Sequence, residues 1–253
     1  MSIKRNPKLG LQLYTLREPL ASDYAGVIRQ VAEAGYAGVE PAGFPGSSLE
    51  EAVALYRDLG LTVCSVHTAL PVGDQKEEVL EQMRALGATR IVAGRGPAQF
   101  KDLAAIQESC ALFNEAAANA AAAGMTFHIH NHWWEFGVVD GRRVYEIMLE
   151  HLDPSVGFEI DVYWVQTGGC DPAAVIREMD GRAPLLHIKD GPCVKEEPMV
   201  AVGQGKVDMK AISEAASQTE WFIVELDRCA TDMMEAVRQS AAYLLEKGWV
   251  DGR

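Results

Sequence analysis

The sequence predicts a (β/α)₈ TIM barrel, and three observations support this prediction. The chain has 253 residues, close to the ~250 typical of such barrels. Eight short apolar segments alternate with segments of helical periodicity, a pattern that predicts a parallel sheet. No GxGxxG or P-loop pattern follows a predicted strand, which disfavours an open doubly wound sheet. We therefore expect one barrel domain over residues 1–253.

Each predicted strand is apolar or β-branched through its body and ends in a polar or charged residue or near a turn. This is typical of a strand that is buried on both faces and meets solvent or a ligand at its C-terminal end. The predicted strands are Leu9–Tyr14, Gly38–Pro41, Thr62–His67, Arg90–Gly94, Met125–His130, Val156–Asp161, Leu185–Asp190 and Trp221–Asp227.

The segments between them carry apolar residues at helical spacing with charges in between. Several are followed by a glycine, as in Leu86-Gly87-Ala88, where a left-handed residue can end the helix before the next strand. The predicted helices are Asp23–Ala34, Leu49–Leu59, Lys76–Leu86, Leu103–Ala123, Arg142–His151, Ala173–Met179, Met209–Ser217 and Met233–Lys247.

Composition restricts the classes of partner. Hydrophobic residues make up 48% and charged residues 23%, as in ordinary globular proteins. The formal net charge of -13 disfavours binding to nucleic acid or to an anionic membrane. The five cysteines are dispersed without a CxxC pair, and neither a membrane span nor a secretory signal is recognisable. We expect a cytoplasmic protein.

Polar residues at the ends of four consecutive predicted strands point to a metal site. Residues two apart on a strand share a face, so His128 with His130, and His187 with Lys189, point the same way. Active sites of barrels lie at this C-terminal end. The polar residues at these four ends are His128 to His132 with Glu135 after them, Asp161, His187 with Lys189 and Asp190, and Glu225 with Asp227.

Taken singly, each of these residues has a structural explanation, such as a hydrogen-bonded core histidine or a helix-capping carboxylate. Together they favour a cation, because burying several charges without one is costly. Mixed nitrogen and oxygen ligands disfavour Ca²⁺. We expect one divalent ion, with Mn²⁺ as first choice and Co²⁺, Fe²⁺, Mg²⁺ and Zn²⁺ as alternatives.

Five motifs carry a resemblance to a known family over essentially the whole chain. They are His130–Phe136 (HNHWWEF), Ile160–Gly169 (IDVYWVQTGG) with Asp171-Pro172, His187–Gly191 (HIKDG), Gly203–Asp208 (GQGKVD) and the strand end at Glu225. With these motifs the chain resembles the sugar phosphate isomerase/epimerase superfamily of xylose isomerase-like TIM barrels, in an HNHxxEF-type branch.

The resemblance implies a metal held by Glu, Asp, His and Glu from the fifth to the eighth strand. The last three match Asp161, His187 and Glu225. At the fifth strand His130 stands where the family has Glu, so either His130 or Glu135 completes the ligand set.

The resemblance also implies a reaction in which a metal-bound sugar loses a proton next to its carbonyl and forms an enediolate. The candidate catalytic residues are Glu225, His132, Lys189 and Glu135. Lys189 has the alternative role of a salt bridge with Asp161 or Asp190, and Asp190 that of orienting His187. The candidate substrate contacts are His67, Tyr14, Gln12, Trp133 and Trp164.

The predicted function is that of a metal-dependent isomerase or epimerase, with a lyase or dehydratase as second choice. The substrate would be a small carbohydrate: a keto-sugar, 3-keto-glycoside or inosose. The alternatives are a non-catalytic sugar-binding subunit and an endonuclease IV-like DNA repair enzyme, the latter disfavoured by the negative charge. Family members are often homo-oligomers, and the resemblance extends this expectation to the present chain.

Overall fold

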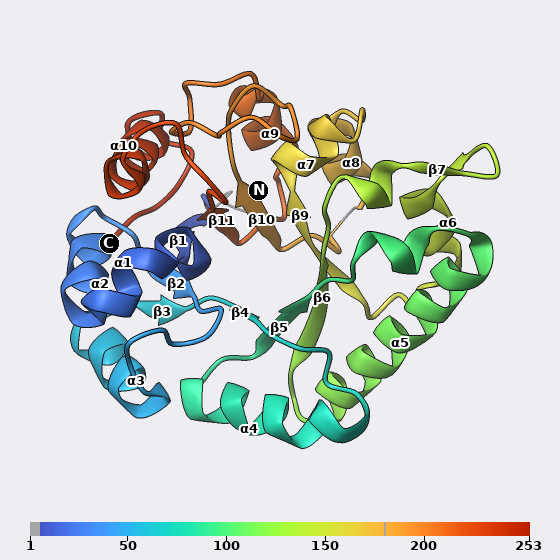
Figure 1. Ribbon diagram of the computed structural model, residues 1–253, viewed down its shortest axis with the longest axis horizontal. Helices are drawn as coiled ribbons and strands as arrows, with labels where there is room; N and C mark the ends of the chain where they lie inside the picture. Colours follow the sequence, from blue (N-terminus) through green and yellow to red (C-terminus); the bar gives the residue numbers. More distant parts are fainter. Residues whose placement is uncertain (1–5, 180) are drawn as a thin grey trace, which may run out of the picture.

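A parallel sheet curves into a barrel, and helices surround it (Figure 1). The computed structural model describes residues 6–179 and 181–253. The strand order in the sheet is β3-β2-β1-β11-β10-β9-β6-β5-β4. The strands are β1 (Lys8–Gln12), β2 (Gly38–Glu40), β3 (Thr62–Val63), β4 (Val66–His67), β5 (Arg90–Ala93), β6 (Thr126–His130), β9 (Gly157–Asp161), β10 (Leu185–Ile188) and β11 (Trp221–Val224).

The two outermost strands in this order, β3 and β4, are halves of one predicted strand, Thr62–His67. The backbone N–H of Cys64 donates to the Val39 carbonyl at 3.0 Å, on the β2 side. The N–H of Thr68 donates to the Val92 carbonyl at 2.9 Å, on the β5 side. This stretch therefore joins the two edges of the sheet, which confirms the predicted (β/α)₈ barrel.

Helices cover the outside of the barrel (Figure 1). They are α1 (Arg17–Ser22), α2 (Tyr24–Glu33), α3 (Leu49–Asp58), α4 (Lys76–Leu86), α5 (Leu103–Ala122), α6 (Val144–His151), α7 (Val162–Thr167), α8 (Pro172–Glu178), α9 (Met209–Ala215) and α10 (Met233–Glu246). In the described part of the chain, no helix combines the length and the apolar character that crossing a membrane requires.

Some predicted boundaries are wrong for local reasons. The first strand ends at Gln12, because the Gln12 side chain accepts a hydrogen bond from the Tyr14 N–H and starts a 3₁₀ turn. Arg142–Arg143 form strand β8, which pairs with β7 (Val138–Val139) in an antiparallel hairpin. The short helix α7, which follows Asp161 directly, was not among the predicted helices.

The barrel has two apolar cores. A large one lies between strands and helices, and a small one inside the barrel consists of Cys64, Val92, Leu185, Trp221 and Ile223. The small core lies toward the N-terminal ends of the strands. Leu185 precedes His187 by two residues, and Ile223 precedes Glu225 by two, so the polar site continues the same inward-facing rows.

Candidate metal centre

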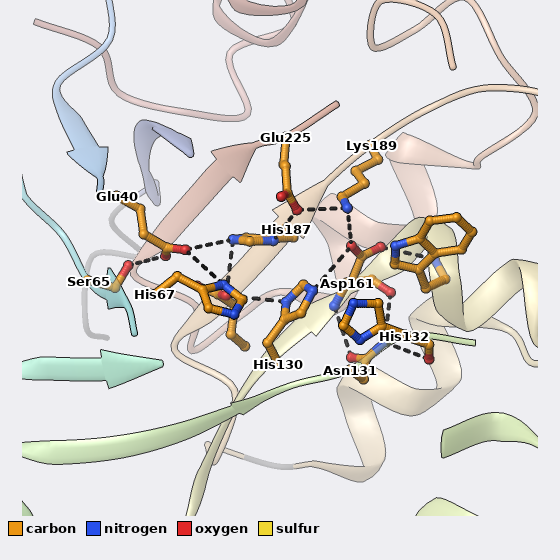
Figure 2. A network of polar contacts seen from close by, with 12 residues as sticks. Glu40, Ser65, His67, His130, Asn131, His132, Asp161, His187, Lys189 and Glu225 are labelled. Atoms are coloured by element: carbon orange, nitrogen blue, oxygen red, sulfur yellow. Dashed lines mark hydrogen bonds and ion pairs between the residues drawn. The ribbon is translucent and has the colours of Figure 1, made fainter. Parts of the chain in front are cut away.

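The inward-facing rows place four predicted ligands around one point. His130 ends β6, Asp161 ends β9, His187 lies on β10 and Glu225 follows β11. Each offers one ligand atom, and the four atoms lie within 4.8 Å of one another. All four side chains are buried. Figure 2 shows them converging from neighbouring strands.

The unpartnered atoms of this cluster fit a metal ion. His130 Nδ1, Asp161 Oδ2, His187 Nδ1 and Glu225 Oε2 are all buried, and among the described residues they have ion-pair contacts but no aligned hydrogen bond. Buried polar atoms are normally hydrogen-bonded, so Asp161 Oδ2, His187 Nδ1 and Glu225 Oε2 need an explanation, and His130 turns its Nε2 toward this group, 4.0 Å from Asp161 Oδ2. A divalent ion with mixed imidazole and carboxylate ligands would satisfy all four residues at once.

Lys189 places a positive charge against the carboxylates of the cluster. Its Nζ lies 2.9 Å from Asp161 Oδ2, 2.7 Å from Glu225 Oε2 and 2.8 Å from Asp227 Oδ2. Its side chain is 1% exposed. The predicted salt bridge with Asp161 is therefore present, and the lysine also reaches two carboxylates at the end of the eighth strand.

These contacts set the charge of the cluster. Burial alone would raise the pKa of Glu225, but the charges of Lys189 and His187 outweigh it and hold the pKa well below its ordinary value. Burial raises the pKa of Asp161 to about 6, against the lowering effect of Lys189. Glu225 is therefore ionised at neutral pH and can serve as a ligand or as a base.

His130 has the properties of a neutral ligand. Burial lowers its pKa well below the ordinary value, and neighbouring imidazoles add to the effect. Its ring lies 4.6 Å from that of His187 and 4.9 Å from that of His132, between ring centroids. A metal ligand must be an unprotonated imidazole, and burial keeps His130 in that form.

Glu135 lies apart from the four-atom cluster. It is 2% exposed, and its Oε2 accepts a hydrogen bond from the His132 N–H at 2.9 Å. It shares a small apolar cavity with Ile129 and Phe136, outside the barrel wall. The structure thus brings His130, and not Glu135, to the other three predicted ligands.

The burial of Glu135 predicts a pH-dependent loss of stability. Burial raises the pKa of this carboxyl to about 8. A group whose pKa is higher in the folded state stabilises the fold at low pH, and this contribution is lost as the pH rises from about 4.5 to about 8. We therefore expect the unfolding temperature of Glu135→Gln, measured relative to the wild type, to be several degrees higher at pH 8 than at pH 5. The conversion is about 2–4 °C per kcal/mol.

Thermal unfolding at both pH values measures this effect. Glu78→Gln, on the exposed surface of α4, is the matched control and should follow the wild type. An unfolding difference between Glu135→Gln and wild type that is the same at both pH values would contradict the assignment.

A second buried carboxylate at this site, Glu159, was missed in the sequence. It precedes Asp161 by two residues on β9, is fully buried and faces the barrel interior. Its Oε2 lies 3.0 Å from His187 Nε2 and 3.3 Å from His130 Nδ1. The alternation of Glu-Ile-Asp along the strand was the signal that could have revealed it.

The predicted substrate contacts occupy different environments. Gln12 is 2% exposed and caps the 3₁₀ turn after β1. Tyr14 is 44% exposed, and the Arg17 guanidinium lies over its ring. His67 is half-buried, with its ring centroid 5.1 Å from that of His130. Of these three residues, His67 thus lies in direct contact with the cluster.

The predicted aromatic contacts border a hollow beside the cluster. Trp133 and Trp164 lie with ring centroids 4.8 Å apart, and Lys189 Nζ is 5.5 Å from the ring of Trp164. Trp164 is almost fully buried, whereas Trp133 is half-buried. The hollow has a volume of about 450 Å³ and is lined by His132, Trp133, Trp164, Lys195, Glu196, Asp227 and Arg228.

Asp190 organises a loop and does not orient His187. One carboxylate oxygen accepts from the N–H groups of Gly191 and Val207, at 2.8 and 3.1 Å. The other accepts from Gly203 and Gly205, at 2.9 and 3.0 Å. The segment between β10 and α9 is therefore anchored to the strand end that carries Lys189.

Comparison with known proteins identifies the family. Residues 28–247 match the model of the xylose isomerase-like TIM barrel family, and the chain belongs to this family. The resemblance inferred from the motifs is thereby confirmed. A comparison with curated proteins finds no match.

Several solved structures share the fold. A sugar phosphate isomerase/epimerase from Parabacteroides distasonis ATCC 8503 is 26% identical, with a TM-score of 0.80 over 99% of this chain and 97% of that one. A probable 3-DHS dehydratase from Bacillus anthracis is 16% identical, with a TM-score of 0.74 over 94% and 97% of the two chains. The IOLI protein with a bound zinc atom is 18% identical, with a TM-score of 0.72 over 94% and 97%. At these lower identities, the last two show similarity of fold only.

Proposed function

We propose that this protein is a divalent-metal-dependent isomerase or epimerase of a keto-sugar, a 3-keto-glycoside or an inosose. The observation that carries the proposal is the convergence of four buried ligand atoms within 4.8 Å at the C-terminal end of the barrel. We assign the ligands as His130, Asp161, His187 and Glu225. Mn²⁺ is the first choice of ion, and the zinc-bound IOLI protein of the same fold makes Zn²⁺ the first alternative.

The bound ion would polarise a substrate carbonyl and stabilise the enediolate formed when the neighbouring carbon loses a proton. Glu225 is ionised and would lie beside the ion, where it could remove that proton. Lys189 Nζ lies on the same side, 2.7 Å from Glu225 Oε2, and can stabilise developing negative charge on oxygen. His132, at the edge of the neighbouring hollow, can position a hydroxyl group.

Trp133 and Trp164 support a carbohydrate substrate. They border the hollow next to Lys189 and Asp227, where an apolar ring face can contact the C–H surface of a sugar. The acidic and basic side chains around the same hollow can bind hydroxyl groups. The scarcity of cations at the cluster favours an unphosphorylated sugar.

Proton exchange tests the proposal. The protein loaded with Mn²⁺ should catalyse the incorporation of deuterium from D₂O next to the carbonyl of a 3-keto-glucoside, measured by ¹H NMR. Removal of the ion with a chelator should abolish the exchange, and added Mn²⁺ should restore it. The products formed then separate isomerisation and epimerisation from elimination.

A binding subunit without catalysis would give the opposite result. In that case the sugar would bind, as seen by calorimetry, without exchange of any carbon-bound proton. Exchange that persists in the chelated protein would contradict the role of the ion.

A further inference from the structure

A second group of potential ligands lies directly beside the first. Glu40 at the end of β2, His67 on β4 and Glu159 on β9 each offer one ligand atom, and these atoms lie within 4.8 Å of one another. Glu40 and Glu159 are fully buried. None of these three residues belongs to the ligand set assigned above. Figure 2 shows Glu40 and His67 on the side of His187 that faces away from Lys189.

The ring of His187 separates the two groups. Its Nδ1 faces the first group, 2.8 Å from Glu225 Oε2. Its Nε2 faces the second group, 3.3 Å from Glu40 Oε1 and 3.0 Å from Glu159 Oε2. One imidazole can therefore bind an ion through Nδ1 and donate its Nε2–H to a carboxylate of the second group.

The surroundings of Glu159 indicate that the second group lacks a group that neutralises its charge. Glu159 Oε2 has ion-pair contacts with His187 Nε2 at 3.0 Å and His130 Nδ1 at 3.3 Å, but neither oxygen has an aligned hydrogen bond among the described residues, although the side chain is fully buried. His67 Nδ1, which lies 3.8 Å from Glu40 Oε1, likewise has no such partner within the described chain. A buried carboxylate left in this state is costly unless a cation or a proton neutralises it.

The balance of charge leads to the same conclusion. Five carboxylates form the connected cluster: Glu40, Glu159, Asp161, Glu225 and Asp227. Lys189 balances one of them, and one divalent ion at the first group balances two more. A histidine that ligates an ion is neutral, so His187 then contributes no charge. Two carboxylates remain, Glu40 and Glu159, and one further divalent ion would balance both in their ionised form.

We propose that Glu40, His67 and Glu159 bind a second divalent ion, so that the barrel holds two neighbouring ions linked through His187, which binds the first ion and donates its Nε2–H to a carboxylate ligand of the second. Two carboxylates and one imidazole suit Mn²⁺ or Zn²⁺. His67 thus becomes a metal ligand at the rim of the barrel, a more specific role than contact with the substrate.

Metal counting tests the proposal. Wild-type protein loaded with Mn²⁺ and freed of excess should contain two ions per chain by elemental analysis, and its electron paramagnetic resonance spectrum should show coupled ions. Glu159→Gln should contain one ion and show an uncoupled spectrum. Glu135→Gln, which alters another buried carboxyl outside both groups, is the matched control and should keep two ions.

A second variant, at the rim of the barrel, keeps the test valid if Glu159→Gln fails to fold. His67→Asn changes a half-buried side chain and should also reduce the content from two ions to one. A wild-type content of one ion, or two ions retained in both Glu159→Gln and His67→Asn, would overturn the proposal. Because the readout is metal content, its outcome is independent of the proton exchange that tests the proposed function.

Discussion

His187→Ala should lose the ion bound by His130, Asp161, His187 and Glu225, and with it proton exchange. His187 is fully buried at the centre of the cluster, and its Nδ1 lies 2.8 Å from Glu225 Oε2. Without this ligand the remaining groups form an incomplete site, and the stabilisation of the enediolate is lost. We expect a fall in exchange rate of at least about 10³-fold, and one bound ion fewer per chain than in the wild type.

His128→Ala is the matched control for this variant. His128 is also a buried histidine inside the barrel, but its Nε2 hydrogen-bonds the Thr126 hydroxyl at 2.9 Å and it belongs to neither ligand group. It should keep the metal content of the wild type. Unchanged metal content in His187→Ala, measured by elemental analysis, would remove the basis of the assigned site.

Lys189→Met should destabilise the metal-free protein more than the metal-loaded protein. Three carboxylates lie within 2.9 Å of Lys189 Nζ, and the lysine is almost fully buried. Removal of one partner from a buried ion pair costs about 3–5 kcal/mol. In the loaded protein the ion would still neutralise Asp161 and Glu225, so the decrease in the free energy of unfolding should be smaller.

Denaturant unfolding with and without chelator measures this difference. Lys195→Met, an exposed lysine beside the same hollow, should change the free energy of unfolding by no more than about 0.5 kcal/mol in either state. An equal loss in both states for Lys189→Met would show that the lysine does not share its carboxylates with an ion. Proton exchange in the loaded variant should fall by about 10²-fold.

The fold was predictable because each strand carried its own signal. A strand buried on both faces reads as an apolar run, and a polar residue at its end marks the C-terminal side of the barrel. Asp161, His187 and Glu225 were accessible to this reasoning because each lies in the polar end of such a run. Their convergence then followed from the geometry of a closed parallel sheet.

Other features depend on contacts that only the folded chain defines. Glu159 lies within an apolar strand, and its role depends on its neighbours β6 and β10, which the sequence does not pair by itself. Counting residues along the sequence could not decide whether His130 or Glu135 is the fourth ligand. A 3₁₀ turn at Trp134–Phe136, visible only in the folded chain, directs Glu135 away from the barrel axis. The break in the third strand similarly reflects closure of the barrel.

The anchoring of Asp190 has a consequence for how this scaffold can diversify. Its carboxylate clamps both ends of the segment from Gly191 to Val207, so residues between the clamped positions can change without displacing Lys189. Lys195 and Glu196, which border the hollow, lie inside this segment. Related proteins can therefore acquire new substrate preferences by exchanging this one loop, while the reactive groups on the strands stay in place.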